Sequence, residues 1–181
     1  QNSSHRIILL HGWGADADDL LPVGKSIIDN SSLEFELISL QAPNFRPNDM
    51  GRQWYSLFPP NWNEAEIAVN KLLNTLKAFD ESKVSLKKTV LLGFSQGGAM
   101  ALDAGFRLDL GLVISCSGYA HPKWDPIKNN PVLLSHGLQD EVVPVKASRE
   151  ISKRLVNEAN LNNVLHEYNC SHTIHPDFIE V

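Results

Sequence analysis

The chain has 181 residues and a formal net charge of -5 at pH 7, with 43% hydrophobic and 20% charged residues. This length allows one ordinary domain with a sizeable core, so we expect residues 1–181 to form a single domain. The composition is typical of a soluble globular protein. The negative charge, and a sequence without a Lys/Arg cluster, argue against binding to nucleic acid or to an anionic membrane surface.

The sequence also bears on the cellular compartment. No apolar run approaches the roughly 18 residues of a membrane-spanning helix, so we expect no integral membrane contact. The first residues, QNSSHRIILLHG, lack the basic start and long apolar stretch of a signal peptide. Cys116 lies in an apolar run and Cys170 in a loop-like stretch, which favours free thiols over a disulfide framework. Together these features predict a cytoplasmic protein.

Short apolar runs rich in β-branched residues predict six strands, which begin at His5, Leu33, Lys88, Leu110, Pro131 and Val164. Several of these runs are almost continuously apolar, as in parallel strands that are covered on both faces. Four helical patterns lie between them, beginning at Ala17, Asn63, Gln96 and Lys146. The alternation predicts an α/β domain with a mostly parallel six-stranded sheet and helices on both faces.

Two of the helical patterns carry further expectations. The pattern from Ala17 has acidic residues at its start. In the pattern from Asn63, one face is expected to gather Ile67, Leu72, Leu76 and Phe79. A long irregular stretch, QAPNFRPNDMGRQWYSLFPPNW, begins at Gln41, and a loop of this length in a compact domain is usually functional.

The pattern Gly93-Phe94-Ser95-Gln96-Gly97 joins a predicted strand to a predicted helix. In that context a G-x-S-x-G motif presents its serine on a strained corner, while the glycines leave room for the neighbouring backbone. The start of the helix offers N–H groups to a developing oxyanion. The alternative is a plain glycine turn, but the context favours Ser95 as a nucleophile.

A serine nucleophile needs a histidine base and an orienting carboxylate, which in such a sheet follow in the order Ser, acid, His. Asp140 lies in the loop after the fifth predicted strand, with Glu141 as its neighbouring competitor. His172 lies in the loop after the last strand, and His175 is its rival. His166 falls inside the strand, where we expect a packed or edge side chain.

The second oxyanion donor is expected from the loop after the first strand, His11-Gly12-Trp13-Gly14. We expect the N–H groups of Trp13 and Gln96 to point at the same oxygen, the alternative being a glycine turn with a packed Trp. His11 and His136 each precede a glycine at a strand end and are expected to brace their loops. No cluster has metal-ligand spacing, so neither a metal nor a cofactor is expected.

Five segments resemble, in this order along the chain, the phospholipase/carboxylesterase family of α/β-hydrolases: LLHGWGADADDLLPVG, GRQWYSL, LLGFSQGGAMAL, LLSHGLQDEVVPV and SHTIHPDFI. These small serine esterases include the acyl-protein thioesterases. The resemblance runs from about Ile7 to the end of the chain. It implies a triad of Ser95, Asp140 and His172 and oxyanion donors at Trp13 and Gln96. It also implies that the loop around Trp54, with Tyr55, belongs to the acyl site.

The chain departs from the family pattern in three respects. Ser171 stands where the family usually has glycine before its histidine. Trp54-Tyr55-Ser56 stands where the family often has Trp-Phe-Asp. The six predicted strands match the core of the fold without the two amino-terminal strands of larger members.

We therefore expect a compact α/β-hydrolase fold without a large cap, which hydrolyses carboxylic esters or thioesters of short-to-medium acyl groups through an acyl-enzyme. The substrate is expected to be a small-molecule acyl ester or thioester, an acylated protein or a lysolipid. A serine peptidase, a lactone hydrolase or a catalytically silent binding protein on this fold are the alternatives. The acyl group is expected to contact the long loop at Phe45, Trp54, Tyr55, Leu57 and Phe58, unless these residues pack beneath the loop instead.

Overall fold

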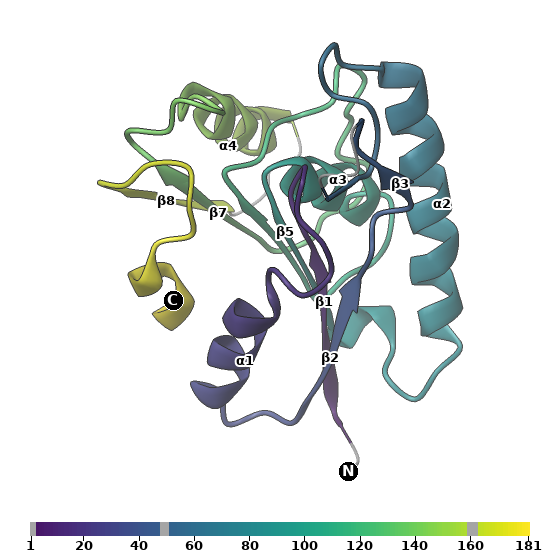
Figure 1. The fold of residues 1–181 in the computed structure, drawn as a ribbon. Coiled ribbons are helices and arrows are strands. Elements are labelled where there is room, and N and C mark those ends of the chain that lie inside the picture. The colour runs from purple at the N-terminus through teal and green to yellow at the C-terminus, as the bar shows by residue number, and fades with distance from the viewer. Residues whose placement is uncertain (1–2, 48–50, 159–162) are drawn as a thin grey trace.

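A computed structural model describes residues 3–47, 51–158 and 163–181. Its main sheet contains β1 (His5–Leu10), β2 (Phe35–Leu40), β5 (Thr89–Phe94), β6 (Leu112–Cys116), β7 (Val132–Gly137) and β8 (Asn163–Tyr168). The strand order is β2-β1-β5-β6-β7-β8, and every neighbouring pair is parallel (Figure 1). The six predicted strands and the parallel sheet are confirmed.

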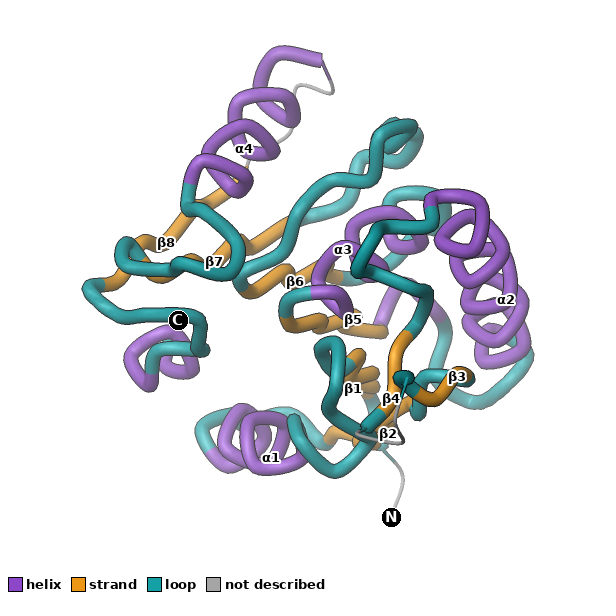
Figure 2. Tube along the Cα trace, turned by 45° about the horizontal axis from the view of Figure 1, so that its top comes forward, coloured by secondary structure: helices purple, strands orange, loops and turns teal. Residues whose placement is uncertain are grey.

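The helices cover the two faces of this sheet. They are α1 (Leu21–Asp29), α2 (Trp62–Asp80), α3 (Gln96–Gly105) and α4 (Lys146–Glu158), with short 3₁₀ helices at Leu86–Lys88 and Pro176–Glu180. Figure 2 shows α2, α3 and α4 on one face and α1 with the carboxyl-terminal 3₁₀ helix on the other. In β1, Ile8 and Leu10 face the first layer and Ile7 and Leu9 the second, which explains why the strands read as continuous apolar runs.

Two expectations about the helices are wrong in detail. In α2 the side chains of Leu72 and Leu76 are buried, but Ile67 is 55% exposed. Ile67 precedes Leu72 by five residues, which rotates it about 140° away on a helix of 3.6 residues per turn. Helix α1 begins only at Leu21, with a proline in its first turn, so the acidic residues lie in the turns before it and not in the helix.

The long stretch after β2 contains a small hairpin that is hydrogen-bonded to the loop after β1. Its strands are β3 (Asn44–Phe45) and β4 (Arg52–Gln53), which pair antiparallel. The N–H of Gly14 donates to the carbonyl of Arg52 at 2.7 Å, and the N–H of Arg52 donates to the carbonyl of Ala15 at 2.8 Å. The HGWG loop is thereby held against residues far along the sequence.

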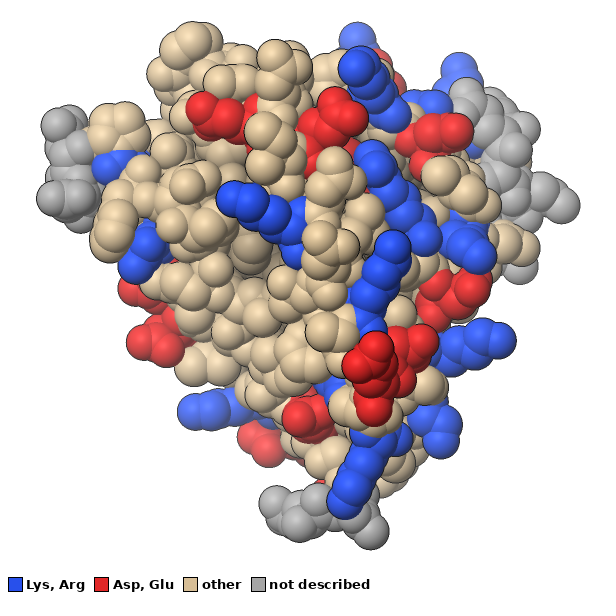
Figure 3. Space-filling model, turned by 90° about the vertical axis from the view of Figure 1, so that its right-hand side faces the viewer, with Lys and Arg blue, Asp and Glu red and all other residues tan. Residues whose placement is uncertain are grey.

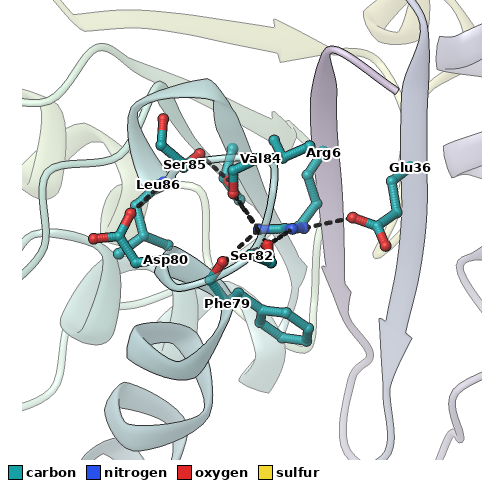
Figure 4. A network of polar contacts seen from close by, with 9 residues as sticks. Arg6, Glu36, Phe79, Asp80, Ser82, Val84, Ser85 and Leu86 are labelled. Atoms are coloured by element: carbon teal, nitrogen blue, oxygen red, sulfur yellow. Dashed lines mark hydrogen bonds and ion pairs between the residues drawn. The ribbon is translucent and has the colours of Figure 1, made fainter. Parts of the chain in front are cut away.

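The amino-terminal end of β1 carries a buried arginine. The side chain of Arg6 is 2% exposed, and its Nε donates to Glu36 Oε2 on β2 at 2.9 Å. On its other side the guanidinium donates to the carbonyl of Val84 at 2.9 Å and to the hydroxyl of Ser82 (Figure 4). Arg6 thus fastens the turn between α2 and β5 to the sheet, at the edge opposite the carboxyl ends of the strands.

The connection from β6 to β7, residues 117–131, contains no helix or strand and lies wholly within the described residues. It provides no large cap, as expected. The surface that includes α2 shows acidic and basic side chains interspersed (Figure 3). Of the helices in the described ranges, none is both long and apolar enough to span a bilayer.

Candidate active site

Three of the residues singled out by the sequence meet at the carboxyl edge of the sheet. Ser95 directly follows β5, Asp140 lies in the loop after β7, and His172 lies in the loop after β8. Because all six strands are parallel, their carboxyl ends share one edge, where ligands of open α/β sheets usually bind. Ser95 and Asp140 are 45 positions apart in the sequence, and Asp140 and His172 are 32 positions apart. All three become neighbours at this edge.

Ser95 occupies a sharp corner between β5 and α3. Its backbone has φ 55° and ψ −116°, outside the usual regions for a residue with a side chain. A Cβ at Gly93 would lie 2.0 Å from the carbonyl oxygen of Gly97, and a Cβ at Gly97 would lie 1.9 Å from that of Leu10. Both glycines of the motif are therefore required by close backbone approach. The corner is fixed from β6 by a 2.9 Å hydrogen bond from the Ser95 N–H to the carbonyl of Cys116.

A line of hydrogen bonds joins the three side chains. His172 Nε2 lies 3.0 Å from Ser95 Oγ, and His172 Nδ1 lies 2.6 Å from Asp140 Oδ2. An ionised carboxylate only accepts, so Nδ1 carries the proton and Nε2 is free to accept the proton of the serine hydroxyl. This tautomer is the one that a general base beside a serine requires.

Asp140 is buried but well supplied with donors. Burial by itself would raise the pKa of its carboxyl group, but hydrogen bonds from His172 and from the N–H groups of Val143 and Val142 outweigh it and hold the pKa below its usual value. The two backbone donors reach Oδ1 at 2.8 and 2.9 Å, which leaves Oδ2 to His172. The carboxylate is thus ionised and oriented at neutral pH.

The competing residues lie elsewhere. Glu141 is exposed to solvent. His175 caps the last 3₁₀ helix, accepting from the N–H of Asp177 at 3.3 Å, and its ring stacks on Tyr168 with centroids 4.6 Å apart. His166 lies in β8 and packs against Phe178, as expected for a packed side chain.

The proposed oxyanion donors lie next to the serine. Gln96 is the first residue of α3, and a Cβ at Gly12, one residue before Trp13, would lie 3.5 Å from Ser95 Cβ. Within the described part of the chain, the backbone N–H groups of Trp13 and Gln96 donate no hydrogen bond. Their role as donors to a substrate oxygen stays a prediction, which these unoccupied N–H groups support.

The structure buries both expected acyl-site residues. Trp54 is 5% exposed, its indole N–H donates to the carbonyl of His11 at 2.9 Å, and its backbone N–H donates to Gln96 Oε1. Tyr55 is fully buried, and its carbonyl accepts from Gln96 Nε2 at 2.8 Å. The Gln96 side chain therefore clamps this loop, a role that the motif did not predict. A contact of Trp54 or Tyr55 with an acyl group stays a prediction.

A second polar network behind this loop was also missed by the sequence analysis. Tyr55 Oη lies 2.9 Å from His121 Nε2 and 2.6 Å from Tyr119 Oη, and His121 Nδ1 lies 2.7 Å from Asp103 Oδ2. Burial raises the pKa of Tyr119 to about 12, and it raises the pKa of Tyr55 further. Tyr119 lies three residues before a proline, and Asp103 lies inside an apolar helix. Nothing in the sequence around either residue indicates that both belong to one network.

The whole chain, residues 1–181, matches the sequence model of the phospholipase/carboxylesterase family. The chain belongs to this family. It is 30% identical to esterase PE8, whose crystal structure superposes with a TM-score of 0.88 over 98% of this chain and 89% of that one. The fold is accordingly that of the α/β-hydrolases.

Two curated proteins, both acyl-protein thioesterases by name, are also similar to this chain. Acyl-protein thioesterase 1 of Emericella nidulans is 36% identical over 111 residues, which cover 52% of this chain and 46% of that protein. Acyl-protein thioesterase 1 homolog 2 of Dictyostelium discoideum is 24% identical over 161 residues, which cover 77% of this chain and 72% of that protein. The chain thus spans about half the length of the first relative.

The family glycine before the histidine is replaced here by Ser171, and the structure shows why serine fits. Among the described non-glycine residues, only Ser95 and Ser117 have a positive φ, so position 171 does not use the conformational freedom of glycine. The close approach is made from the opposite side, where a Cβ at Gly137 would lie 2.2 Å from the carbonyl oxygen of Ser171.

Proposed function

We propose that the protein is a serine hydrolase that cleaves carboxylic esters or thioesters of short-to-medium acyl groups through an acyl-enzyme. The observation that carries this proposal is the hydrogen-bonded line from Ser95 Oγ through His172 to Asp140, with the serine on a strained corner. Membership of a family that contains esterases supports it.

In the first half-reaction Ser95 Oγ attacks the acyl carbonyl carbon while its proton passes to His172 Nε2, 3.0 Å away. The carbonyl oxygen becomes an oxyanion that accepts hydrogen bonds from the N–H groups of Trp13 and Gln96. Asp140 stabilises the imidazolium without taking its proton. When the tetrahedral intermediate collapses, the bond to the leaving alcohol or thiol breaks and His172 Nε2 returns the proton to that group.

In the second half-reaction a water molecule replaces the leaving group. His172 takes a proton from the water, whose oxygen attacks the acyl carbon, and collapse returns the proton to Ser95 Oγ and releases the carboxylic acid. Every proton transfer in the two half-reactions therefore uses the same nitrogen, His172 Nε2.

The acyl group is proposed to lie along the exposed part of the long loop. Phe58 is 72% exposed, and its ring meets the edge of the Trp13 ring with centroids 5.0 Å apart. An apolar chain leaving the serine beside Trp13 would reach this residue, whereas Trp54 and Tyr55 lie beneath it. The names of the thioesterase relatives support thioesters and acylated proteins as substrates, and lysolipid esters belong to the same chemical class.

The test is hydrolysis of 4-nitrophenyl butyrate and labelling by a fluorophosphonate probe. We expect wild type to do both and Ser95→Ala to lose both, with a fall in kcat of several orders of magnitude and an unchanged far-UV circular dichroism spectrum. His172→Ala should also lose turnover, and His175→Ala, which changes the other histidine of the same loop, should retain most of it. Undiminished labelling of folded Ser95→Ala would refute the proposal.

A substrate panel separates the alternatives. A butyryl thioester, a butyryl anilide and a γ-lactone should be compared with the ester at equal concentrations. Preference for the anilide would favour a peptidase, and preference for the lactone would favour a lactone hydrolase. Binding without labelling or turnover of any of the four would favour a silent hydrolase fold.

A further inference from the structure

We propose that His136, a residue outside the triad, is a positioning residue for the catalytic acid: it holds the loop of Asp140 in place and thereby keeps the carboxylate aligned with His172. This inference rests on the proposed function, because it takes Asp140 and His172 as the acid and the base. His136 belongs to β7, and its side chain is fully buried.

The contacts of His136 converge on the acid loop. Its Nε2 lies 2.7 Å from the carbonyl oxygen of Val143 and 3.3 Å from Asp140 Oδ2, the carboxylate oxygen that also meets His172. Val143 is in turn one of the two residues whose N–H donates to Asp140 Oδ1. His136 therefore touches both the carboxylate and the peptide that orients it.

The surroundings settle the tautomer of His136. The Val143 carbonyl and the Asp140 carboxylate can only accept, so Nε2 must carry a proton. Its Nδ1 lies 2.6 Å from Oγ of Ser148 on α4, and that hydroxyl donates to Nδ1 when the ring is neutral. Ser148 is 1% exposed, and within the described chain its hydroxyl has no other partner, so accepting from a protonated Nδ1 would leave its own proton unpaired.

The N–H group at His136 Nε2, with its partial positive charge on the hydrogen, therefore lies beside the Asp140 carboxylate, the negative group that orients His172. It thereby helps to hold the carboxylate in place, so removing it should let Asp140 Oδ2 shift away from His172 Nδ1, which lies 2.6 Å from it. A further charged group near His136 among the described residues is Glu167 on β8, whose carboxylate is paired with Arg149 at 2.6 and 2.9 Å. Its charge is thus already compensated.

The experiment compares two polar substitutions of His136. In His136→Gln the terminal amide can place an N–H near the position of ring Nε2, whereas the shorter side chain of His136→Asn cannot. We expect the chemical shift of the His172 Nδ1 proton, followed by NMR and assigned by its loss in His172→Ala, to change in His136→Asn. In His136→Gln the value should stay close to that of wild type.

Turnover of 4-nitrophenyl butyrate provides the second readout. In His136→Asn we expect kcat to fall about 10-fold, as when a hydrogen bond that holds a reacting group in place is lost, with KM unchanged because His136 does not touch substrate. His136→Gln should restore kcat. An equal loss in the two variants, or a His172 Nδ1 signal and a kcat that do not change in folded His136→Asn, would overturn the inference.

Two further variants keep the test decisive. If neither substitution of His136 gives a folded protein, Ser148→Ala removes the hydrogen bond that fixes the orientation of the His136 ring. We expect kcat and the His172 Nδ1 signal to change there in the same direction, and no change in either would overturn the inference. Glu167→Gln alters a charge near His136 without touching Asp140 and should leave kcat and the His172 Nδ1 signal unchanged. The NMR measurement needs no substrate, so it reports on His136 even if wild type hydrolyses no ester, a result that would refute the proposed function alone.

Discussion

At the scale of single residues, the site combines one strained backbone with fully satisfied side chains. Ser95 has a positive φ, a conformation of the kind that costs about 1–3 kcal/mol for a residue other than glycine. The hydrogen bond from its N–H to Cys116 and the helix that follows hold it there. The hydroxyl is thereby aimed by the backbone, and its partner His172 is aimed by a carboxylate that itself accepts two backbone hydrogen bonds.

A first prediction concerns that carboxylate. Asp140→Asn can donate as well as accept, so it no longer forces the proton of His172 onto Nδ1, and we expect kcat for ester hydrolysis to fall by about 10⁴-fold. The temperature of unfolding should change little, because the amide keeps an oxygen for the N–H groups of Val142 and Val143. Glu141→Gln, one position along and exposed, is the matched control and should keep wild-type kcat. A larger loss in the control would move the acid to Glu141.

At the scale of elements, the loops after β7 and β8 act as one unit. The N–H of Leu138 donates to the carbonyl of Tyr168, and the N–H of Gln139 donates to that of Cys170, at 2.8 and 3.0 Å. Gly137 lets these backbones meet, since a Cβ there would lie 2.4 Å from the carbonyl oxygen of Cys170. The distance between the acid and the base is therefore set by contacts between two loops.

This pairing yields a second prediction. Gly137→Ala should push the two loops apart and lower kcat by at least about 100-fold, since small misplacements at reacting groups cost that much. Gly111→Ala is the control, because a Cβ at Gly111 would also crowd a carbonyl oxygen, that of Lys87 at 2.7 Å, but outside the site. Gly111→Ala should lower the free energy of unfolding measured in urea, but kcat of the folded protein should not fall comparably. Equal kcat in the two folded variants would contradict the argument.

The exposed end of the long loop carries a third prediction. If Phe58 contacts the acyl chain, kcat/KM of wild type should rise from acetyl through hexanoyl esters by up to about 0.8 kcal/mol per buried methylene and then level off. Phe58→Ala should flatten this rise and spare acetyl esters. Ile67→Ala, which removes another exposed apolar side chain (55%) but on α2, is the control and should keep the wild-type profile. A chain-length profile that Phe58→Ala leaves unchanged would place the acyl group elsewhere.

Elements were predictable from the sequence because their signals are local. Each of the six strands is an apolar run, and the four helices follow from apolar spacing, although the face of α2 was misjudged at Ile67. The order of Ser95, Asp140 and His172 follows from a motif and from strand ends. The burial of Trp54 and Tyr55, the clamp by Gln96 and the contact of His136 with Asp140 depend on which segments meet across the fold, and no local pattern carries that information.

At the scale of the whole molecule, buried carboxylates make folding sensitive to acid. Asp103 is buried in α3, and although burial alone would raise the pKa of its carboxyl group, contacts with His121 and Arg107 hold it below its usual value. A carboxyl group whose pKa is lower in the folded than in the unfolded state stabilises folding above its unfolded pKa, near 3.9 for Asp. That contribution is lost as the pH falls through the folded pKa.

The fourth prediction follows from this sign. The free energy of unfolding of wild type in urea should decrease between pH 5 and pH 3, and Asp103→Asn should be less stable at pH 7 by about 1–3 kcal/mol but show a shallower decrease. Asp109→Asn is the matched control, since its carboxylate is 60% exposed and pairs with Lys128 at the surface. It should follow the wild-type curve, and a slope in Asp103→Asn as steep as that of wild type would show that the acid sensitivity arises elsewhere.

The position of β8 at the end of the sheet has a consequence for how the protein loses activity on heating. Ser95 follows β5, which has a neighbour on both sides, whereas His172 follows β8, which in the described part of the chain is the end strand beside β7. Border strands fray and exchange their amide protons sooner than interior ones. Each local opening of β8 would move the His172 imidazole away while the Ser95 hydroxyl stays in place. Activity would therefore be lost at a lower temperature than the unfolding of the whole protein that circular dichroism detects.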